Sequence, residues 1–435
     1  QLTALLDLDS ATTPRISSDG ARVVYTRWSV DWMNDQWIGS LWLTDGNGGQ
    51  GRELGQGRGP RWSPDGSALA YLKPRPDGTT ALVLVSMDPA VDPRTLMVSP
   101  SYPRDLQWSP DGHLISFRMG VPGADVGWSI DMPPAPDGAQ WAPPPHVIKR
   151  MHYRLDGLGY HYFGYEHLFV VDVKTGDLRQ LTNGNWHVGS KPAGLDMDTG
   201  TSWSPDSQKI YFDGVAHEDY ESVYGHSNIY SLEIETGVIN HLDLPRGFWI
   251  NPTVSPDGKS VAFSGFEHQE QVQTYTAREL WTSATDGTGL RKISDNLDRD
   301  VDTLQWSSDG GGVYFSADHN GTRQVFFATG AAGVRQVTKG NHAVYLGNFD
   351  QHGTAIASLS RPNRPSEVVS FKLDTFDGFE PVTDLNGSKL AGAPIGTIEG
   401  LHFNSADGTS VEGWLLKPAD FDPSTKYPLI LEIHG

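Results

Sequence analysis

Two groups of side chains in this sequence are of types that could bind a charged ligand. The first is the acidic stretch HEDYESVYGH at residues 217–226, which contains Glu218, Asp219 and Glu221. Carboxylates on such a loop could bind the free α-ammonium group of a peptide through charge-assisted hydrogen bonds. A solvated acidic loop on an acidic protein would explain the same residues.

The second group lies between Pro-rich stretches and is rich in arginine and tyrosine. It includes Arg150, Tyr153 and Arg154 in the stretch VIKRMHYRLDGLGY. Planar guanidinium groups among tyrosines suit a substrate carboxylate or a peptide backbone. They suit an interface with another domain equally well.

Metal and nucleophile motifs are weak or absent. Asp298, Asp300 and Asp302 form a D-x-D-x-D start, but Thr303 stands where a calcium loop needs Gly and Asp309 replaces the bidentate Glu. The sequence has no HExxH motif, no G-x-S-x-G motif and no Cys. We therefore expect no metal, no cofactor and no catalytic triad within these 435 residues.

The composition indicates a globular, turn-rich protein. Hydrophobic residues make up 37% of the 435 residues, and 49 Gly and 29 Pro favour β-structure over helix. The net charge of −20 would repel nucleic acid, and no apolar run is long enough to cross a bilayer. We expect neither a nucleic-acid nor a membrane partner, and a location in the cytoplasm or, alternatively, the periplasm.

One short sequence motif, typified by WSPDG and followed by alternating apolar residues, recurs along the chain, and we call it the phrase. Its seven copies are RISSDGARVVYT, RWSPDGSALAYL, QWSPDGHLISFR, SWSPDSQKIYFD, TVSPDGKSVAFS, QWSSDGGGVYFS and NFDQHGTAIASL. Pro, Asp and Gly in this order are typical of a type I turn. Each copy therefore predicts a turn between two strands, with Ser and Asp bonding to the turn and Trp packing between repeats.

The spacing of the phrase predicts an all-β fold, a seven-bladed β-propeller with four strands per blade. The residues before the turn recur at intervals of 43 to 52 residues, apart from one interval of 95 between Trp108 and Trp203. We read the long interval as an insertion at 119–165 in the third blade. The propeller then covers residues 14–384, after an N-terminal segment at 1–13.

The repeated phrase no longer occurs after residue 385, and a different sequence pattern follows. Alternating apolar residues around Asp407 and Gly408 predict a hairpin at residues 398–417, and the apolar run at 427–433 predicts a buried strand. That run ends in His434 and Gly435, the first two positions of the HGG-type oxyanion loop of α/β-hydrolases. We interpret residues 385–435 as a linker and the first strands of an α/β-hydrolase domain. An ordinary turn after a strand is the alternative for His434 and Gly435.

Together these features resemble a prolyl oligopeptidase family serine peptidase, of the branch with acylaminoacyl peptidases and bacterial dipeptidyl peptidases. The resemblance is carried by the repeated WSPDG phrases, by VIKRMHYRLDGLGY with HLFVVDVKTG, and by KPADFDPSTKYPLILEIHG. It implies hydrolysis of short peptides by a Ser-His-Asp triad downstream of Gly435, with the propeller covering the site and excluding folded proteins.

The implied partners are a short peptide, the hydrolase domain or a complementary fragment, and a second copy in a homo-oligomer. A non-catalytic propeller of the TolB type that binds proteins is the alternative. It explains the repeats but leaves residues 398–435 unexplained.

Overall fold

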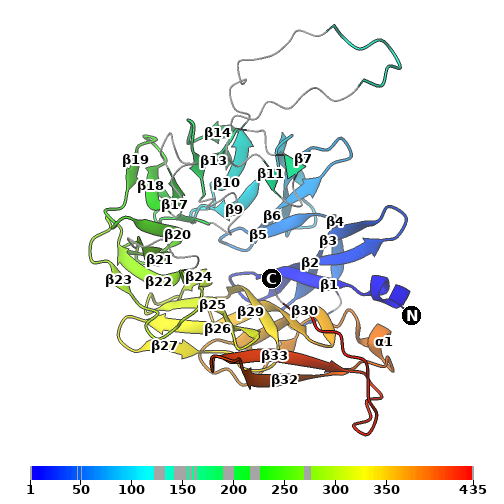
Figure 1. Ribbon diagram of the computed structural model, residues 1–435. Coiled ribbons are helices and arrows are strands. Elements are labelled where there is room, and N and C mark those ends of the chain that lie inside the picture. The colour runs from blue at the N-terminus through cyan, green and yellow to red at the C-terminus, as the bar shows by residue number, and fades with distance from the viewer. Residues whose placement is uncertain are drawn as a thin grey trace.

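The computed structural model describes residues 2–46, 48–49, 51–121, 133–141, 154–155, 159–160, 164–189, 200–215, 226–268 and 276–433. Nearly all regular structure in these ranges is β-strand (Figure 1), as the sequence predicts. The helical segments described are the 3-10 helix η1 (Leu2–Asp7) and the short helix α1 (Gly387–Leu390). No helix in the described ranges is long and apolar enough to span a membrane.

The strands form antiparallel sheets that follow one another along the chain. The first sheet consists of β1 (Ser10–Ile16), β2 (Arg22–Asp31), β3 (Gln36–Asp45) and β4 (Arg52–Gln56). The second consists of β5 (Arg58–Trp62), β6 (Ala68–Pro74), β7 (Thr80–Ser86) and β8 (Arg94–Ser99). The third consists of β9 (Arg104–Trp108), β10 (Leu114–Val121), β13 (Tyr165–Asp172) and β14 (Leu178–Gln180).

The later sheets repeat the pattern. The fourth consists of β16 (Thr201–Trp203), β17 (Lys209–Val215), β18 (Asn228–Glu233) and β19 (Ile239–His241), with β15 (His187–Val188) also beside β17. The fifth consists of β20 (Gly247–Val254), β21 (Ser260–Glu267), β22 (Glu279–Ala284) and β23 (Arg291–Lys292).

The eight strands from β24 to β31 are linked into one sheet with two antiparallel halves. The first half, here the sixth sheet, consists of β24 (Asp302–Trp306), β25 (Val313–His319), β26 (Thr322–Thr329) and β27 (Gly333–Gln336). The second half, here the seventh sheet, consists of β28 (Ala343–Phe349), β29 (Thr354–Arg361), β30 (Arg364–Lys372) and β31 (Glu380–Pro381). The parallel pair Arg323↔Ala343 joins the halves.

The sheets are arranged around a common centre in chain order (Figure 1). The first strands of neighbouring sheets contact each other, from β1 to β5 and on through β9, β16, β20 and β24. At the other end, β1 contacts β28, β29 and β30 of the seventh sheet. Each sheet thus turns its first strand toward the centre and its fourth strand toward the outside.

The repeated phrase forms the turn that the sequence predicts. Each innermost strand ends at the residue before the turn, for example β5 at Trp62, and the next strand starts a few residues later. In the second sheet, Ser63 Oγ donates to Asp65 Oδ1 at 2.6 Å and accepts the N–H of Ala68 at 2.9 Å. Gly66 follows with φ of +70°, a conformation that suits glycine. The serine hydroxyl and backbone N–H groups lower the pKa of Asp65.

The tryptophans of the phrase join neighbouring sheets, which confirms their predicted structural role. Trp62 Nε1 donates to the carbonyl of Arg15 at 3.0 Å, and Trp108 Nε1 donates to the carbonyl of Arg61 at 3.1 Å. Trp306 Nε1 makes the equivalent bond to the carbonyl of Thr253 in the preceding sheet. We call these contacts the internal joints.

The contact between the first and seventh sheets, which we call the end joint, uses polar side chains. Asn348 on β28 accepts the N–H of Ile16 at 2.8 Å and donates to its carbonyl at 2.9 Å. The fully buried Asn386 makes the same two-way pair with the backbone of Asp9, at 2.9 and 2.8 Å. The carboxylate of Asp9 also binds Arg27 and Lys389, at 2.7 and 2.6 Å.

The first strand starts earlier than the sequence predicts. Strand β1 begins at Ser10, before the predicted boundary at residue 14.

The third-sheet insertion is shorter than predicted. Pairing of β10 with β13 continues to Val121↔Tyr165, so residues 119–121 and 165 belong to the sheet, because their backbone groups complete its ladder. Within the insertion, β11 (Arg154–Leu155) and β12 (Gly159–Tyr160) form a two-residue hairpin that the sequence did not predict.

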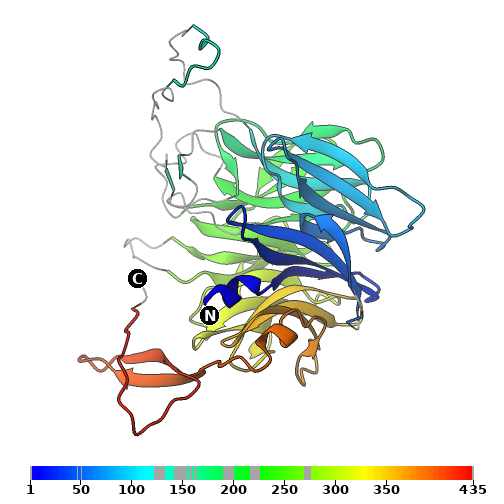
Figure 2. The same cartoon turned by 90° about the vertical axis from the view of Figure 1, so that its right-hand side faces the viewer.

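The C-terminal residues bear out one expectation and contradict another. The predicted hairpin is present as β32 (Thr397–Asn404) and β33 (Ser410–Lys417), and Figure 2 shows it projecting from one side of the sheets. The predicted strand at residues 427–433 is wrong: this run has no strand pairing, and Ile430 is 93% exposed. A strand needs a hydrogen-bonded neighbour, and no described strand lies beside it.

Candidate functional site

Most side chains that the sequence singles out lie outside the described residues. These are Glu218, Asp219, Glu221, Arg150, Tyr153, His434 and Gly435. Arg154 is described: it lies on β11 opposite Tyr160 and its side chain is exposed. The binding and oxyanion roles of these residues stay predictions.

The third and fourth sheets meet at a charged cluster that the sequence analysis missed. Glu166 on β13 is buried, and its carboxylate lies 3.5 Å from Arg118 and 3.6 Å from Arg104. Its N–H donates to Nδ1 of His187 at 2.9 Å, and His187 pairs with Val215, two residues before the acidic loop. The insertion, which ends at β13, and the acidic loop, which follows β17, therefore both adjoin this cluster, although about 50 residues separate them in the sequence.

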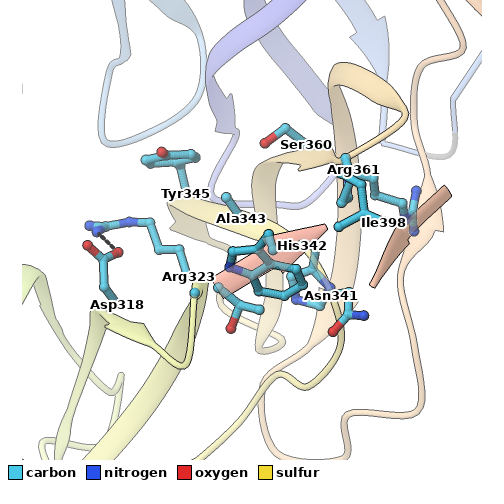
Figure 3. A pocket seen from close by; sticks show the side chains of 13 residues that line it. Asp318, Arg323, Asn341, His342, Ala343, Tyr345, Ser360, Arg361 and Ile398 are labelled. Carbon is cyan, nitrogen blue, oxygen red and sulfur yellow. Dashed lines mark hydrogen bonds and ion pairs between the residues drawn. The ribbon is translucent and has the colours of Figure 1, made fainter. Parts of the chain in front are cut away.

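A second candidate is a pocket of 560 Å³ between the sixth and seventh sheets and the C-terminal hairpin (Figure 3). The hairpin supplies Ile398 and Trp414 to its wall. Trp414 packs on Gly321 in the β25–β26 turn, where a Cβ would lie 2.5 Å from the indole. Gly321 has φ of +63°, so the turn and the close contact both require glycine.

Arg323 carries a positive charge in this pocket. Its guanidinium group pairs with Asp318 at 2.9 Å and with Asp302, and it lies 5.0 Å from the ring centre of Tyr345 (Figure 3). Burial lowers the pKa of Arg323, but the carboxylates of Asp302 and Asp318 outweigh it, so the pKa is raised. The group is a permanent cation with two carboxylate partners.

His342 gives the pocket a buried neutral imidazole. Its Nε2 lies 3.0 Å from Oε1 of the buried Gln324. Burial, with a contribution from Arg361, lowers the pKa of His342. Within the described part of the chain, no hydrogen bond joins His342 to Ser360, the serine of this pocket. The imidazole is thus held by Gln324, and nucleophilic catalysis would require a base beside the serine instead.

The acidic pattern near residue 300 is used by ion pairs. Asp300 binds Arg278 at 2.6 Å, and Asp302 binds Arg323. Among the described residues there is no group of three or more His, Cys, Asp or Glu side chains that could hold a metal. The D-x-D pattern was the sequence signal for this region, but it gave no indication of the arginine partners.

The sequence has relatives among peptidases. Residues 143–264 match the model of the dipeptidyl peptidase IV (DPP IV) N-terminal region. The uncharacterized peptidase YuxL of Bacillus subtilis is 27% identical over 449 residues, covering 98% of this chain and 64% of its own length. Dipeptidyl-peptidase 5 of Porphyromonas gingivalis is 27% identical over 246 residues, covering 54% of this chain and 34% of its own length. The chain thus spans less than two thirds of these relatives.

Solved structures show the same fold. An acylaminoacyl peptidase in complex with Z-Gly-Gly-Phe-chloromethyl ketone superposes with a TM-score of 0.74 at 16% identity, over 98% of this chain and 60% of that one. The β-propeller domain of the Trilobed protease from Pyrococcus furiosus gives a TM-score of 0.59 at 15% identity, over 87% of this chain and 96% of that domain. The predicted resemblance is confirmed. This chain is similar to the propeller region of prolyl oligopeptidase-type peptidases.

Proposed function

We propose that this chain is the substrate-gating propeller of a serine peptidase that cleaves peptide bonds in short peptides, as an exopeptidase or an oligopeptidase. The observation that carries the proposal is the match to YuxL, which runs through 98% of the chain, including the hairpin that follows the sheets. A propeller that only binds proteins would not need this continuation. The triad would lie in the part of the complete protein that corresponds to the remainder of YuxL.

We further propose that the sheets are the seven blades of a propeller, which starts with β1 at Ser10 rather than at the predicted residue 14 and ends near residue 384, with the insertion in blade 3 and a hydrolase domain beginning after 385. The alternation of four-stranded sheets and repeated turns supports this count. The exposed apolar run at residues 427–433 supports a partner domain, since Leu429, Ile430 and Leu431 would be covered by it. The cytoplasm or the periplasm as compartment, and a homo-oligomeric state, belong to the same proposal.

The acidic loop and the arginine-rich insertion are the proposed substrate-binding elements. The insertion ends where β13 begins, next to Glu166, and the acidic loop follows the end of β17 at Val215, whose partner His187 accepts the N–H of Glu166. Both segments therefore adjoin the Glu166 cluster. Carboxylates from one segment and guanidinium groups from the other could bind the two charged ends of a short peptide.

The test uses the complete protein that carries this chain. We expect turnover of short peptide substrates that a serine-directed phosphonate abolishes, because the activated serine is the group it modifies. In the complete protein, Glu218→Gln, Asp219→Asn or Glu221→Gln should lower kcat/KM about tenfold to a hundredfold on free-amine substrates and leave N-acylated ones nearly unchanged. Phosphonate-resistant turnover, or none, would contradict the proposed function.

A further inference from the structure

Two arginines occupy equivalent positions on the innermost strands of the first and second sheets. Arg15 and Arg61 each precede the last residue of their strand, Ile16 and Trp62. Each follows a proline, and each lies next to a bulge in the ladder between Thr12 and Arg15 or between Arg58 and Arg61. A bulge changes the direction of the side chains beside it, and proline at a bulge forgoes no ladder bond.

The fold does not require a cation at this position. The other five sheets carry neutral residues there, namely Gln107, Ser202, Thr253, Gln305 and Asn348. Three of these bond to the backbone of a neighbouring sheet: Ser202 accepts the N–H of Val254, Gln305 donates to Gly347, and Asn348 pairs with Ile16. The fifth sheet also has proline before this position, followed by Thr253 instead of arginine.

Neither guanidinium group has a carboxylate partner among the described residues. Arg15 Nη1 donates to the carbonyl of Pro14 at 3.2 Å, and Arg61 Nη1 donates to that of Pro60 at 3.0 Å. The carboxylate that acts on both is Asp105, at longer range. Asp105 already accepts hydrogen bonds from the N–H and Oγ1 of Thr201, at 2.7 and 2.9 Å, and from Gln107 at 2.9 Å.

Burial destabilises the charge of both arginines, and Arg61 further destabilises the charge of Arg15. Burial and the neighbouring Arg61 together lower the pKa of Arg15 to about 9, although the carboxylate of Asp105 acts in the opposite direction. Burial also lowers the pKa of Arg61. Arg15 and Arg61 are two half-buried cations, and the carboxylate of Asp105 near them already accepts other hydrogen bonds. They therefore leave a local excess of positive charge, although the net charge of the whole chain is −20. Such a charge is costly unless an anion pairs with it.

We propose that Arg15 and Arg61 form a binding site for the carboxylate of a ligand at the centre of the sheets. Two planar guanidinium groups provide the donors that a carboxylate accepts. Under the proposed function, the ligand is the C-terminal carboxylate of a short peptide, so its identity rests on that function. The site itself follows from the unpaired arginines.

Binding is tested by calorimetry on the complete protein, with its serine blocked by the phosphonate. The probes are N-acetyl-Ala-Ala-Ala with a free C-terminal carboxylate, the same peptide as its C-terminal amide, and inorganic phosphate. We expect the free acid to bind at least tenfold more tightly than the amide. Equal binding of acid and amide, or binding of phosphate without the acid, would overturn the proposal.

Variants assign the binding to the two arginines. Arg15→Gln and Arg61→Gln should each weaken the free acid at least tenfold, and Gln fits the fold because Gln107 and Gln305 occupy equivalent positions. Arg52→Gln on the exposed outer strand of the first sheet makes the same charge change and should leave binding unaltered. Without ligand, the two test variants should melt at the same temperature as the unsubstituted protein or higher, whereas purely structural arginines would give a lower Tm. Carboxylate binding that survives both substitutions would refute the site, whether or not the protein is a peptidase.

Discussion

The internal joints and the end joint hold neighbouring sheets by different chemistry. At an internal joint, an indole N–H reaches a backbone carbonyl, as Trp62 does to Arg15, and a polar side chain such as Ser202 or Gln305 adds a single bond between some of the other internal neighbours. At the end joint, Asn348 and Asn386 each make a donor and an acceptor bond to the backbone of the first sheet or its leading residue. Internal neighbours are also tied by a short connection of the chain, but residues 9 and 386 are far apart in sequence. The end joint therefore needs more specific polar contacts.

The largest effect is expected at the end joint. Asn386→Ala would leave the buried N–H and carbonyl of Asp9 without partners, because the side chain that satisfies both is fully buried. Each of the two unsatisfied buried groups costs about 1–3 kcal/mol, so the free energy of unfolding should fall by about 2–6 kcal/mol. Guanidinium unfolding followed by tryptophan fluorescence measures the change.

The matched control is Asn240→Ala on the exposed strand β19, which should change stability by less than about 0.5 kcal/mol. If both variants lost the same stability, the end joint would have no special role.

An intermediate effect is expected at an internal joint. Trp62→Phe keeps an aromatic ring but removes the bond from Nε1 to the carbonyl of Arg15. We expect a loss of about 1 kcal/mol, the usual net value of one hydrogen bond, from the same unfolding measurement.

Trp37→Phe serves as the control for this change, since Trp37 is 57% exposed. A Trp62→Phe loss as large as that of Asn386→Ala would remove the distinction between the two kinds of joint.

The same contrast explains what could be predicted from the sequence. The turn of the phrase is stabilised by local interactions. Ser63 bonds to Asp65 and to the backbone of the next strand, and Gly66 adopts the positive φ of the turn. The strand ends were therefore predicted correctly. The pairing of Asp9 with Asn386 joins residues 377 apart, and no spacing pattern marks it. Arg323 was missed for the same reason, because its partner Asp302 was read as part of a local acidic pattern. The run at 427–433 has strand composition, but composition does not supply the neighbouring strand.

The smallest effect concerns the turn carboxylates, of which Asp65 belongs to an internal repeat and Asp350 to the end joint. Asp350 is buried, accepts the N–H groups of His352 and Thr354 at 2.8 Å, and its turn bonds back to Ser18 through Gln351 N–H at 3.2 Å. Asp350→Asn should therefore lower the free energy of unfolding at pH 7 more than Asp65→Asn, because the carboxylate of Asp65 is largely solvated.

The pKa of Asp65 is lowered from 3.8, so its contribution to the free energy of unfolding is present at neutral pH and is lost as pH falls below 3.8. The difference between Asp65→Asn and the unsubstituted protein should accordingly shrink toward zero in urea unfolding repeated at successively lower pH from 7 to about 2. A difference that persisted at the acid end would mean that Asp65 acts through its shape rather than its charge, and equal losses for the two variants at pH 7 would show that the end joint gains nothing from Asp350.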